Sequence, residues 1–194
     1  MIPLCMRTLN VYNYGCFVCF QIAMIFSTSR GKDLDLYITA KSETVVFSKS
    51  GCKLPKIMRD IQEKIPKYKK KYKLIHVYFL IGIPDITTMV RGDDYEEVIF
   101  DLPNTIPITE KFKELINLTK SLGGIPCLCT VASMDLKVWN NHRLAENKTT
   151  HLRFKEQYQE MQKKLENSII QINKIIIETN ITNEMHTPLI SDTI

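Results

Sequence analysis

The sequence predicts an α/β protein in which a parallel sheet lies between two layers of helices. The main observation is the apolar and β-branched run within residues 73–87, which ends in a turn containing Gly82, Pro84 and Asp85. Such a run is typical of a strand buried on both faces. Amphipathic helical patterns precede and follow it, as in parallel α/β sheets. With 194 residues and 44% hydrophobic composition, the chain can form one domain with a proper core.

The first part of the chain contains a tail and the beginning of the sheet. Residues 1–14 show no periodicity and are expected to be an N-terminal tail, so that residues 15–194 form the single domain. The β-prone run at residues 16–26 predicts a first buried strand, followed by a turn at residues 27–31. Residues 32–40 suit either a short helix or a strand. Residues 44–48 predict a second strand with a loop at residues 49–53.

A helix leads from this loop into the central strand. Leu54 and Pro55 open the helix, because proline is tolerated in a first helical turn. The apolar stripe from Ile57 to Ile65 predicts a helix that ends near Pro66. After the central strand, the acidic segment 89–107 is a long connection, in which a short helix is expected around residues 95–100.

Two further helices and a strand are predicted in the second half. A helix begins at Thr109, a candidate cap, and stops at Gly123. Residues 125–131 predict the next strand, and its loop runs through residues 132–141. The apolar pattern at residues 150–178 predicts a long helix, with Asn167 as a candidate break. Residues 186–190 suit one more strand or an irregular end.

The net charge of +5 comes largely from one lysine cluster between residues 64 and 73. We favour a solvated helix end, where cations lie favourably near the negative pole of the helix. Nucleic-acid binding stays open as an alternative, because Tyr68 and Tyr72 are interleaved with the lysines and aromatic side chains can stack on single strands. The cluster consists of Lys64, Lys67, Lys69, Lys70, Lys71 and Lys73.

The cysteines give no recognisable metal site. Cys16 and Cys19 have CxxC spacing, but no second pair and no suitably spaced histidine accompanies them. Cys127 and Cys129 are two residues apart on a predicted strand and are expected to pack as free, buried thiols. We therefore expect no metal, and we expect no cofactor.

The N-terminal apolar stretch has two interpretations. Arg7, the apolar core after it and Ser29 at its end give the pattern of a signal peptide, and three N-glycosylation sequons are compatible with secretion. The core is too short for a standard transmembrane helix. We favour a first strand of the sheet, and with it a cytoplasmic location over secretion. The sequence leaves the oligomeric state open.

The order of strands and loops resembles the SGNH (GDSL-type) hydrolase family over roughly residues 16–190. Four short motifs carry the resemblance: Ser27-Thr28-Ser29, Ser50-Gly51-Cys52-Lys53-Leu54, Gly82-Ile83-Pro84-Asp85 and Thr130-Val131-Ala132-Ser133. The resemblance implies a flavodoxin-like sheet with helices on both faces. It also implies a nucleophilic serine at Ser29 and an oxyanion-hole N–H at Gly51, and it aligns Gly82 and Asp85 with the ends of a Gly-x-Asn-Asp motif.

Two departures from the family pattern bear on activity. Pro84 stands where the family has the asparagine that donates to the oxyanion, and proline has neither a side-chain donor nor a backbone N–H. The family's Asp-x-x-His motif does not occur after Asp85, and Asp192 is followed by only two residues. The chain therefore resembles a family member truncated before that motif. Serine needs an adjacent base, so its activation is in doubt.

Three histidines are candidate bases in place of the missing one. His142 and His151 lie near the loop after the strand that contains Cys127, and His186 is nearest in sequence to the family position. His76 lies early in the central strand, at the wrong end for the site, and is expected to be a core or edge histidine.

These features support three functional interpretations. The first is a degenerate or truncated SGNH-like domain that keeps a pocket for a small ester or acylated ligand but does not hydrolyse esters. The second is an active serine esterase or acetyl-ester hydrolase that uses Ser29. The third is a binding module, for nucleic acid through the lysine cluster or for a protein through the long C-terminal helix.

Overall fold

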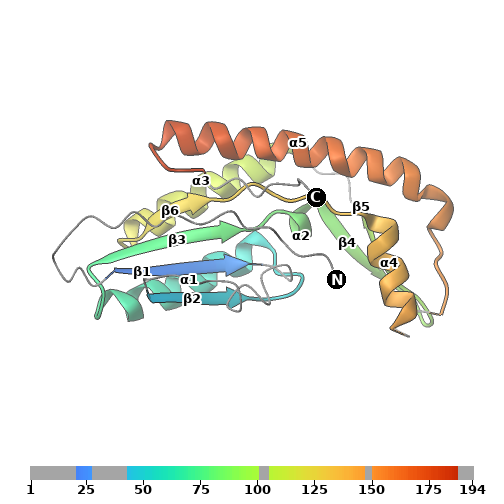
Figure 1. The fold of residues 1–194 in the computed structure, drawn as a ribbon, viewed down its shortest axis with the longest axis horizontal. Coiled ribbons are helices and arrows are strands. Elements are labelled where there is room, and N and C mark those ends of the chain that lie inside the picture. Colours follow the sequence, from blue (N-terminus) through green and yellow to red (C-terminus); the bar gives the residue numbers. More distant parts are fainter. Residues whose placement is uncertain (1–20, 28–42, 101–104, 147–149, 188–194) are drawn as a thin grey trace.

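The computed structural model describes residues 21–27, 43–100, 105–146 and 150–187. A four-stranded parallel sheet has the order β2-β1-β3-β6 (Figure 1). Its strands are β1 (Gln21–Ser27), β2 (Glu43–Ser48), β3 (Leu74–Leu80) and β6 (Ile125–Leu128). The α/β class with a parallel sheet is confirmed. Outside the described residues lie the tail at residues 1–14, the segment 32–40, the cysteines Cys16 and Cys19, and most of the suggested strand at residues 186–190.

The helices α1 (Leu54–Lys69) and α3 (Thr105–Ser121) pack with the sheet in one hydrophobic core. The predicted stripe of α1 is buried, with Ile57, Ile61 and Ile65 each at most 2% exposed. These side chains pack in the same cluster as Met24 and Phe79 of the sheet. Full burial of one such side chain stabilises the fold by about 1.5–3 kcal/mol. The core therefore fixes α1 relative to the sheet edge where its N-terminus lies.

The helix α1 continues past Pro66, where the sequence predicted its end. Proline removes the hydrogen bond to the carbonyl four residues earlier. Pro66 and Gln62 are both exposed, so water can bind the carbonyl of Gln62. The helix is therefore not broken, and Lys67 and Lys69 occupy its last turn near the negative pole.

The aromatic side chains of the lysine cluster are turned toward the protein. Tyr72 is 3% exposed, and Tyr68 stacks on it with 6.2 Å between ring centroids. A buried ring cannot stack on a base, so this geometry supports the helix-end interpretation over nucleic-acid binding. The Nζ of Lys67 also lies 2.7 Å from Glu63, and that of Lys71 lies 3.2 Å from Glu43.

The central strand β3 is fully buried on one face only, so the prediction of burial on both faces is wrong. Ile75, Val77 and Phe79 alternate with the half-buried His76 and Tyr78. The uniform hydrophobicity of the run concealed this alternation, since histidine and tyrosine each have an apolar body. Burial lowers the pKa of His76 and raises that of Tyr78 to about 12.

The segment after β3 forms a hairpin where a short helix was expected around residues 95–100. After the short helix α2 (Ile83–Ile86), strand β4 (Thr87–Arg91) pairs antiparallel with β5 (Glu96–Phe100). The turn between them is closed by the N–H of Gly92, which donates to the carbonyl of Tyr95 at 2.9 Å. β-branched residues on both sides of a Gly-Asp-Asp turn favour this hairpin.

Helix boundaries in the second half differ from the prediction. Helix α3 begins at Thr105 instead of Thr109, because Pro107 lies in a first turn, where proline is tolerated. It stops as predicted before Gly123, whose φ is +82°. The segment predicted as a loop at residues 132–141 contains the start of helix α4 (Leu136–Ala145). Asp135 caps this helix by accepting a hydrogen bond from the N–H of Val138 at 2.8 Å.

The last helix, α5 (Tyr158–Thr182), follows a short 3-10 turn and is not broken at Asn167. Asn167 is exposed, whereas Leu165 and Ile169 on either side of it are buried in the core. Packing of these neighbours outweighs the weak helix propensity of asparagine.

Amide side chains of α5 cover the outer edge of β6. Asn180 accepts from the N–H of Leu128 at 3.4 Å and donates to its carbonyl at 2.8 Å. Asn173 forms the same pair with Val131 at 2.6 and 2.9 Å. An uncovered edge strand presents unpaired N–H and C=O groups, which are a template for aggregation. The helix therefore takes the position that a further strand would have.

Candidate functional site

The carboxyl edge of the sheet begins with the turn after β2. The N–H of Lys49 donates to the carbonyl of Ser27 at the end of β1, at 3.0 Å. The N–H of Cys52 then donates to the carbonyl of Lys49 at 3.2 Å, which closes the turn. Gly51 has a φ of +65° and open space around the position of a Cβ atom. The turn therefore requires glycine for its backbone conformation and leaves room beside it.

The loop after β3 is held close to the segment after β6. Gly82 has a φ of +128°, and a Cβ atom there would lie 2.8 Å from Cγ2 of Val131. Both the conformation and the close approach exclude a larger residue. Pro84 follows in the first turn of α2, and the N–H of Asp85 donates to the carbonyl of Gly82 at 3.0 Å.

Asp85 connects this loop to the start of α1. Its Oδ1 and Oδ2 accept a hydrogen bond from the N–H of Leu54 at 3.2 and 3.3 Å. The residue before the helix, Lys53, makes no side-chain cap, so the carboxylate of Asp85 serves as the cap from a distant position in the sequence. Burial raises the pKa of Asp85, and the Leu54 N–H and the cations of Lys111 and Lys53 oppose that rise.

The structure thus brings two of the predicted motifs together. The loop containing Gly51 leads into the helix whose first N–H is bound by Asp85, next to Gly82 and Pro84. The predicted nucleophile Ser29 follows Ser27, the last residue of β1, by two positions in the sequence and lies outside the described residues.

The candidate bases His142 and His151 are exposed and contact acidic side chains. The Nδ1 of His142 in α4 lies 3.5 Å from the carboxylate of Glu146, the residue that follows this helix. The Nδ1 of His151 lies 3.5 Å from Asp94, and its ring lies 5.8 Å from that of Tyr95 at the hairpin turn. Both histidines therefore belong to the region formed by the hairpin and α4, which extends beyond the carboxyl ends of the sheet strands (Figure 1).

The backbone of the third candidate, His186, lies beside the edge strand β6, near the carboxyl end of that strand. Its carbonyl oxygen accepts a hydrogen bond from Sγ of Cys127 at 2.8 Å. Cys127 pairs with Tyr78 inside the sheet, four residues before Val131 in the sequence. The side chain of His186 is exposed.

The thiols near these residues are poor nucleophiles. Cys52, Cys127 and Cys129 are free and buried, as predicted for the last two. Burial raises the pKa of Cys52, and it raises that of Cys127 to about 12. A thiol rather than a thiolate is therefore present at neutral pH.

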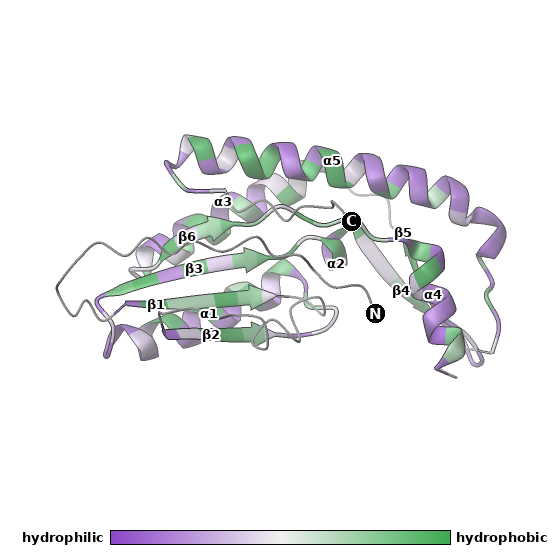
Figure 2. Cartoon of the chain, in the orientation of Figure 1, coloured by the Kyte–Doolittle hydropathy of each residue, from purple (hydrophilic) through white to green (hydrophobic). Residues whose placement is uncertain are grey.

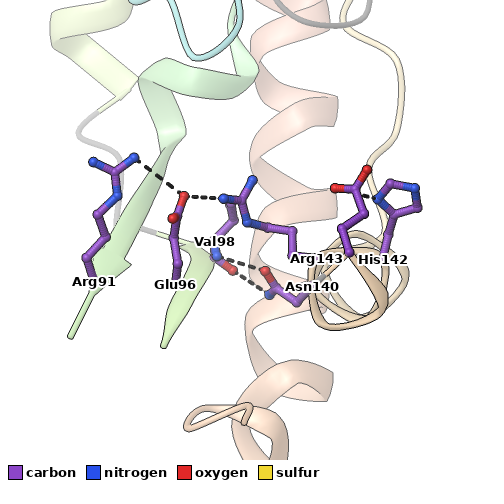
Figure 3. Close-up of polar contacts among 7 residues, drawn as sticks. Arg91, Glu96, Val98, Asn140, His142 and Arg143 are labelled. Atoms are coloured by element: carbon purple, nitrogen blue, oxygen red, sulfur yellow. Dashed lines mark hydrogen bonds and ion pairs between the residues drawn. The ribbon is translucent and has the colours of Figure 1, made fainter. Parts of the chain in front are cut away.

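A polar cluster that sequence patterns did not predict attaches the hairpin to α4. Glu96 pairs with Arg143 of α4 and lies 3.4 Å from Arg91 (Figure 3). Asn140 accepts from the N–H of Val98 and donates to its carbonyl, both at 2.8 Å. Asn140 thus provides hydrogen-bond partners for the backbone N–H and C=O groups of β5, as Asn180 of α5 does for those of β6. Asn140 follows Asp135 and Leu136 on a short helix that itself went unpredicted, so no sequence signal identified it.

A buried carboxylate attaches the same hairpin to the start of α5. Glu97 is 0% exposed and accepts hydrogen bonds from the N–H groups of Arg153 and Phe154 and from the hydroxyl of Tyr158. Burial, and then the hydrogen bond to Glu97, raise the pKa of Tyr158. Because several donors compensate its burial, this carboxylate is a structural element that orders the hairpin.

Metal binding finds no support in the part of the chain that the structure describes. Within those ranges, no group of three or more His, Cys, Asp or Glu side chains is arranged to hold a metal ion. Among the described helices, none is long and apolar enough to span a membrane.

Comparisons with known proteins identify the fold. No protein-family model matches the sequence, and no curated protein matches it. Among solved structures, a GDSL-like lipase from Bacteroides thetaiotaomicron is similar with a TM-score of 0.55 and 12% identity, over 88% of this chain and 68% of the lipase. An acetyl xylan esterase is similar with a TM-score of 0.52 and 12% identity, over 87% of this chain and 77% of the esterase. The chain has a divergent form of the SGNH (GDSL-type) hydrolase fold.

Proposed function

We propose that this protein is an SGNH-like domain that has lost ester hydrolysis. The observation that carries the proposal is Pro84 in the first turn of α2. The resemblance to the family aligns this proline with the asparagine that donates to the oxyanion. Loss of one oxyanion donor costs about a hundred- to a thousandfold in rate. The neighbouring Asp85 has a structural role, since its carboxylate caps α1. This motif therefore maintains the fold without supplying the second oxyanion donor.

The contacts of the histidines support the same conclusion. A base for Ser29 must come within hydrogen-bond reach of its hydroxyl, directly or through one water. His142 and His151 contact Glu146 and Asp94 in the hairpin region, and His186 lies beside the edge strand β6 with its side chain exposed. Without a base, serine is a weak nucleophile.

The retained carboxyl edge is the proposed place for a ligand. The turn at Gly51 keeps its positive φ and open space, and Gly82 keeps the close approach to Val131. We propose that the domain binds a small ester or another acylated molecule there without cleaving it. The esterase named among the similar structures supports this ligand class by fold alone.

Hydrolysis of a short-chain p-nitrophenyl ester tests the loss of activity. Purified wild-type protein is compared with Ser29→Ala, after circular dichroism has shown that both are folded. We expect equal rates, close to spontaneous hydrolysis. Turnover that disappears in Ser29→Ala would overturn the proposal and favour the active serine esterase. Single replacements of His142, His151 and His186 would then identify its base.

Restoring the missing donor is the matched second experiment. In Pro84→Asn, the asparagine supplies the family's oxyanion donor. If only this donor were missing, the rate would rise by about a hundred- to a thousandfold over wild type. We expect no such rise, because under this proposal none of the three candidate histidines serves Ser29 as a base.

A further inference from the structure

The outer side of α5 carries a line of isoleucines that the described part of the chain leaves exposed. Ile170 is 67% exposed, Ile177 is 37% exposed and Ile181 is 69% exposed. Spacings of seven and four residues place the three on one face of the helix. We name Ile170, Ile177 and Ile181 the outer stripe. α5 runs along one outer side of the molecule and carries hydrophobic segments there (Figure 2).

The outer stripe is separate from the parts of α5 that hold the domain together. The inward face contributes Leu165, Ile169, Ile172 and Ile176 to the core. A third side carries Asn173, which pairs with the backbone after β6. Apolar residues on an outer face of a surface helix, in addition to those on its core face, indicate a second contact beyond the core.

Charges beside the outer stripe are complementary to a second copy of the same helix. Lys174 and Glu178 lie between Ile170 and Ile181 in the sequence and flank the outer stripe. The Nζ atom of Lys174 is 3.9 Å from Oε1 of Glu178, and both side chains are more than 60% exposed. Two copies of α5 can pack antiparallel through their outer faces, with a two-fold axis at the level of Ile176 along the helix. Lys174 of each copy then faces Glu178 of the other. The same arrangement brings Ile170 of one copy next to Ile181 of the other and places both Ile177 side chains near the axis.

We propose that α5 forms an antiparallel homodimer interface through the outer stripe, with the Lys174 and Glu178 pairs at its flank. A two-fold interface requires one self-complementary surface, and this stripe with its charges has that property. Three isoleucines on each copy give a contact smaller than the roughly 800 Å² per partner of a standard stable interface. We therefore expect a weak, transient dimer that dissociates on dilution. It is independent of ester hydrolysis.

Sedimentation equilibrium over a range of concentrations tests the dimer. Wild-type protein is expected to shift from monomer to dimer as its concentration rises through the micromolar range. Ile170→Glu combined with Ile181→Glu is expected to stay monomeric, with an unchanged melting curve because both positions are exposed. The matched control is Val138→Glu, which changes a 63% exposed residue on α4 and should leave the dimer intact. A wild-type monomer at hundreds of micromolar would overturn the proposal.

Charge reversal and cross-linking test the antiparallel register. Lys174→Glu or Glu178→Lys alone should raise the dissociation constant by about tenfold or more, because like charges then face each other twice. Combining the two reversals should restore the dimer. In mixtures, Ile170→Cys with Ile181→Cys should form a disulfide-linked dimer, whereas Ile170→Cys alone should not. A dimer that the double reversal does not restore, or that cross-links Ile170→Cys to itself, would contradict this register.

Discussion

Replacing Asp85 with alanine and with asparagine should separate the contribution of its hydrogen bond to α1 from the contribution of its charge. Its oxygens accept from the N–H of Leu54, a residue that is 0% exposed, at 3.2 and 3.3 Å. Asp85→Ala leaves this donor without its partner, which costs about 1–2 kcal/mol of unfolding free energy. For a chain of this size, the melting temperature should fall by about 2–8 °C.

Asp85→Asn is the matched variant, because its amide oxygen still accepts the hydrogen bond and no charge is buried. Burial raises the pKa of Asp85, so the ionised carboxylate of the wild type costs stability at neutral pH. Asp85→Asn should therefore be at least as stable as the wild type at pH 7, while Asp85→Ala is less stable. Chemical denaturation of the three proteins measures the difference. If Asp85→Asn were as unstable as Asp85→Ala, attraction between the charge and the helix N-terminus would outweigh burial, and the reasoning would be refuted.

The pH dependence of the same pair follows from the sign of the shift. A raised pKa means that the folded state holds the proton more tightly than the unfolded state, whose pKa is near the ordinary value of 3.8. The contribution of Asp85 to stability is therefore fully present below pH 3.8 and is lost as the pH rises through the folded pKa. Asparagine does not titrate, so Asp85→Asn does not lose this stability as the pH rises. The unfolding free energy of Asp85→Asn relative to wild type should therefore increase between pH 3.8 and the folded pKa of Asp85, and stay constant at higher pH.

Four other substitutions test the contacts around the sheet edge and the hairpin by chemical denaturation. Asn180→Asp should cost about 2 kcal/mol, because a carboxylate oxygen then faces the carbonyl of Leu128; equal stability would show that the amide pairing is unimportant. Glu97→Gln should cost about 3 kcal/mol, since its NH₂ group faces donors such as the Tyr158 hydroxyl; an unchanged midpoint would contradict this contact. Gly82→Ala should cost about 2 kcal/mol through backbone strain and crowding, whereas Gly51→Ala, which has strain but no crowding, should cost less.

The sheet was predictable because its strands depend on local patterns. Apolar runs identified β2, β3 and β6, and the helical stripe at Ile57, Ile61 and Ile65 identified α1. Two local signals were present but were not used: Asp135 before Leu136 is a cap, and the Gly92 turn lies between two β-prone segments. These signals specify α4 and the hairpin. The predictions of a loop at residues 132–141 and of a short helix at residues 95–100 were therefore wrong although the local sequence contained the signals for α4 and for the hairpin.

The contacts around the candidate site could not be predicted from local patterns. The carboxylate of Asp85 caps a helix that begins at Leu54, and Asn180 pairs with Leu128, so each contact joins residues distant in the sequence. Such pairs depend on how the crossover helices place the chain in space. The resemblance to SGNH hydrolases predicted which loops meet, but the use of Asp85 as a helix cap emerges only from the three-dimensional arrangement.

Fluorophosphonate labelling followed by peptide mass spectrometry tests the central claim most directly, because it reports an activated serine whatever the natural substrate is. The folded wild-type protein and Ser29→Ala are incubated with the label, and the peptide that contains Ser29 is analysed in each. The account predicts that Ser29 stays unmodified and that both proteins give the same background. Stoichiometric modification of Ser29 would show that a base activates it, and would contradict the claim that this SGNH-like domain has lost hydrolysis.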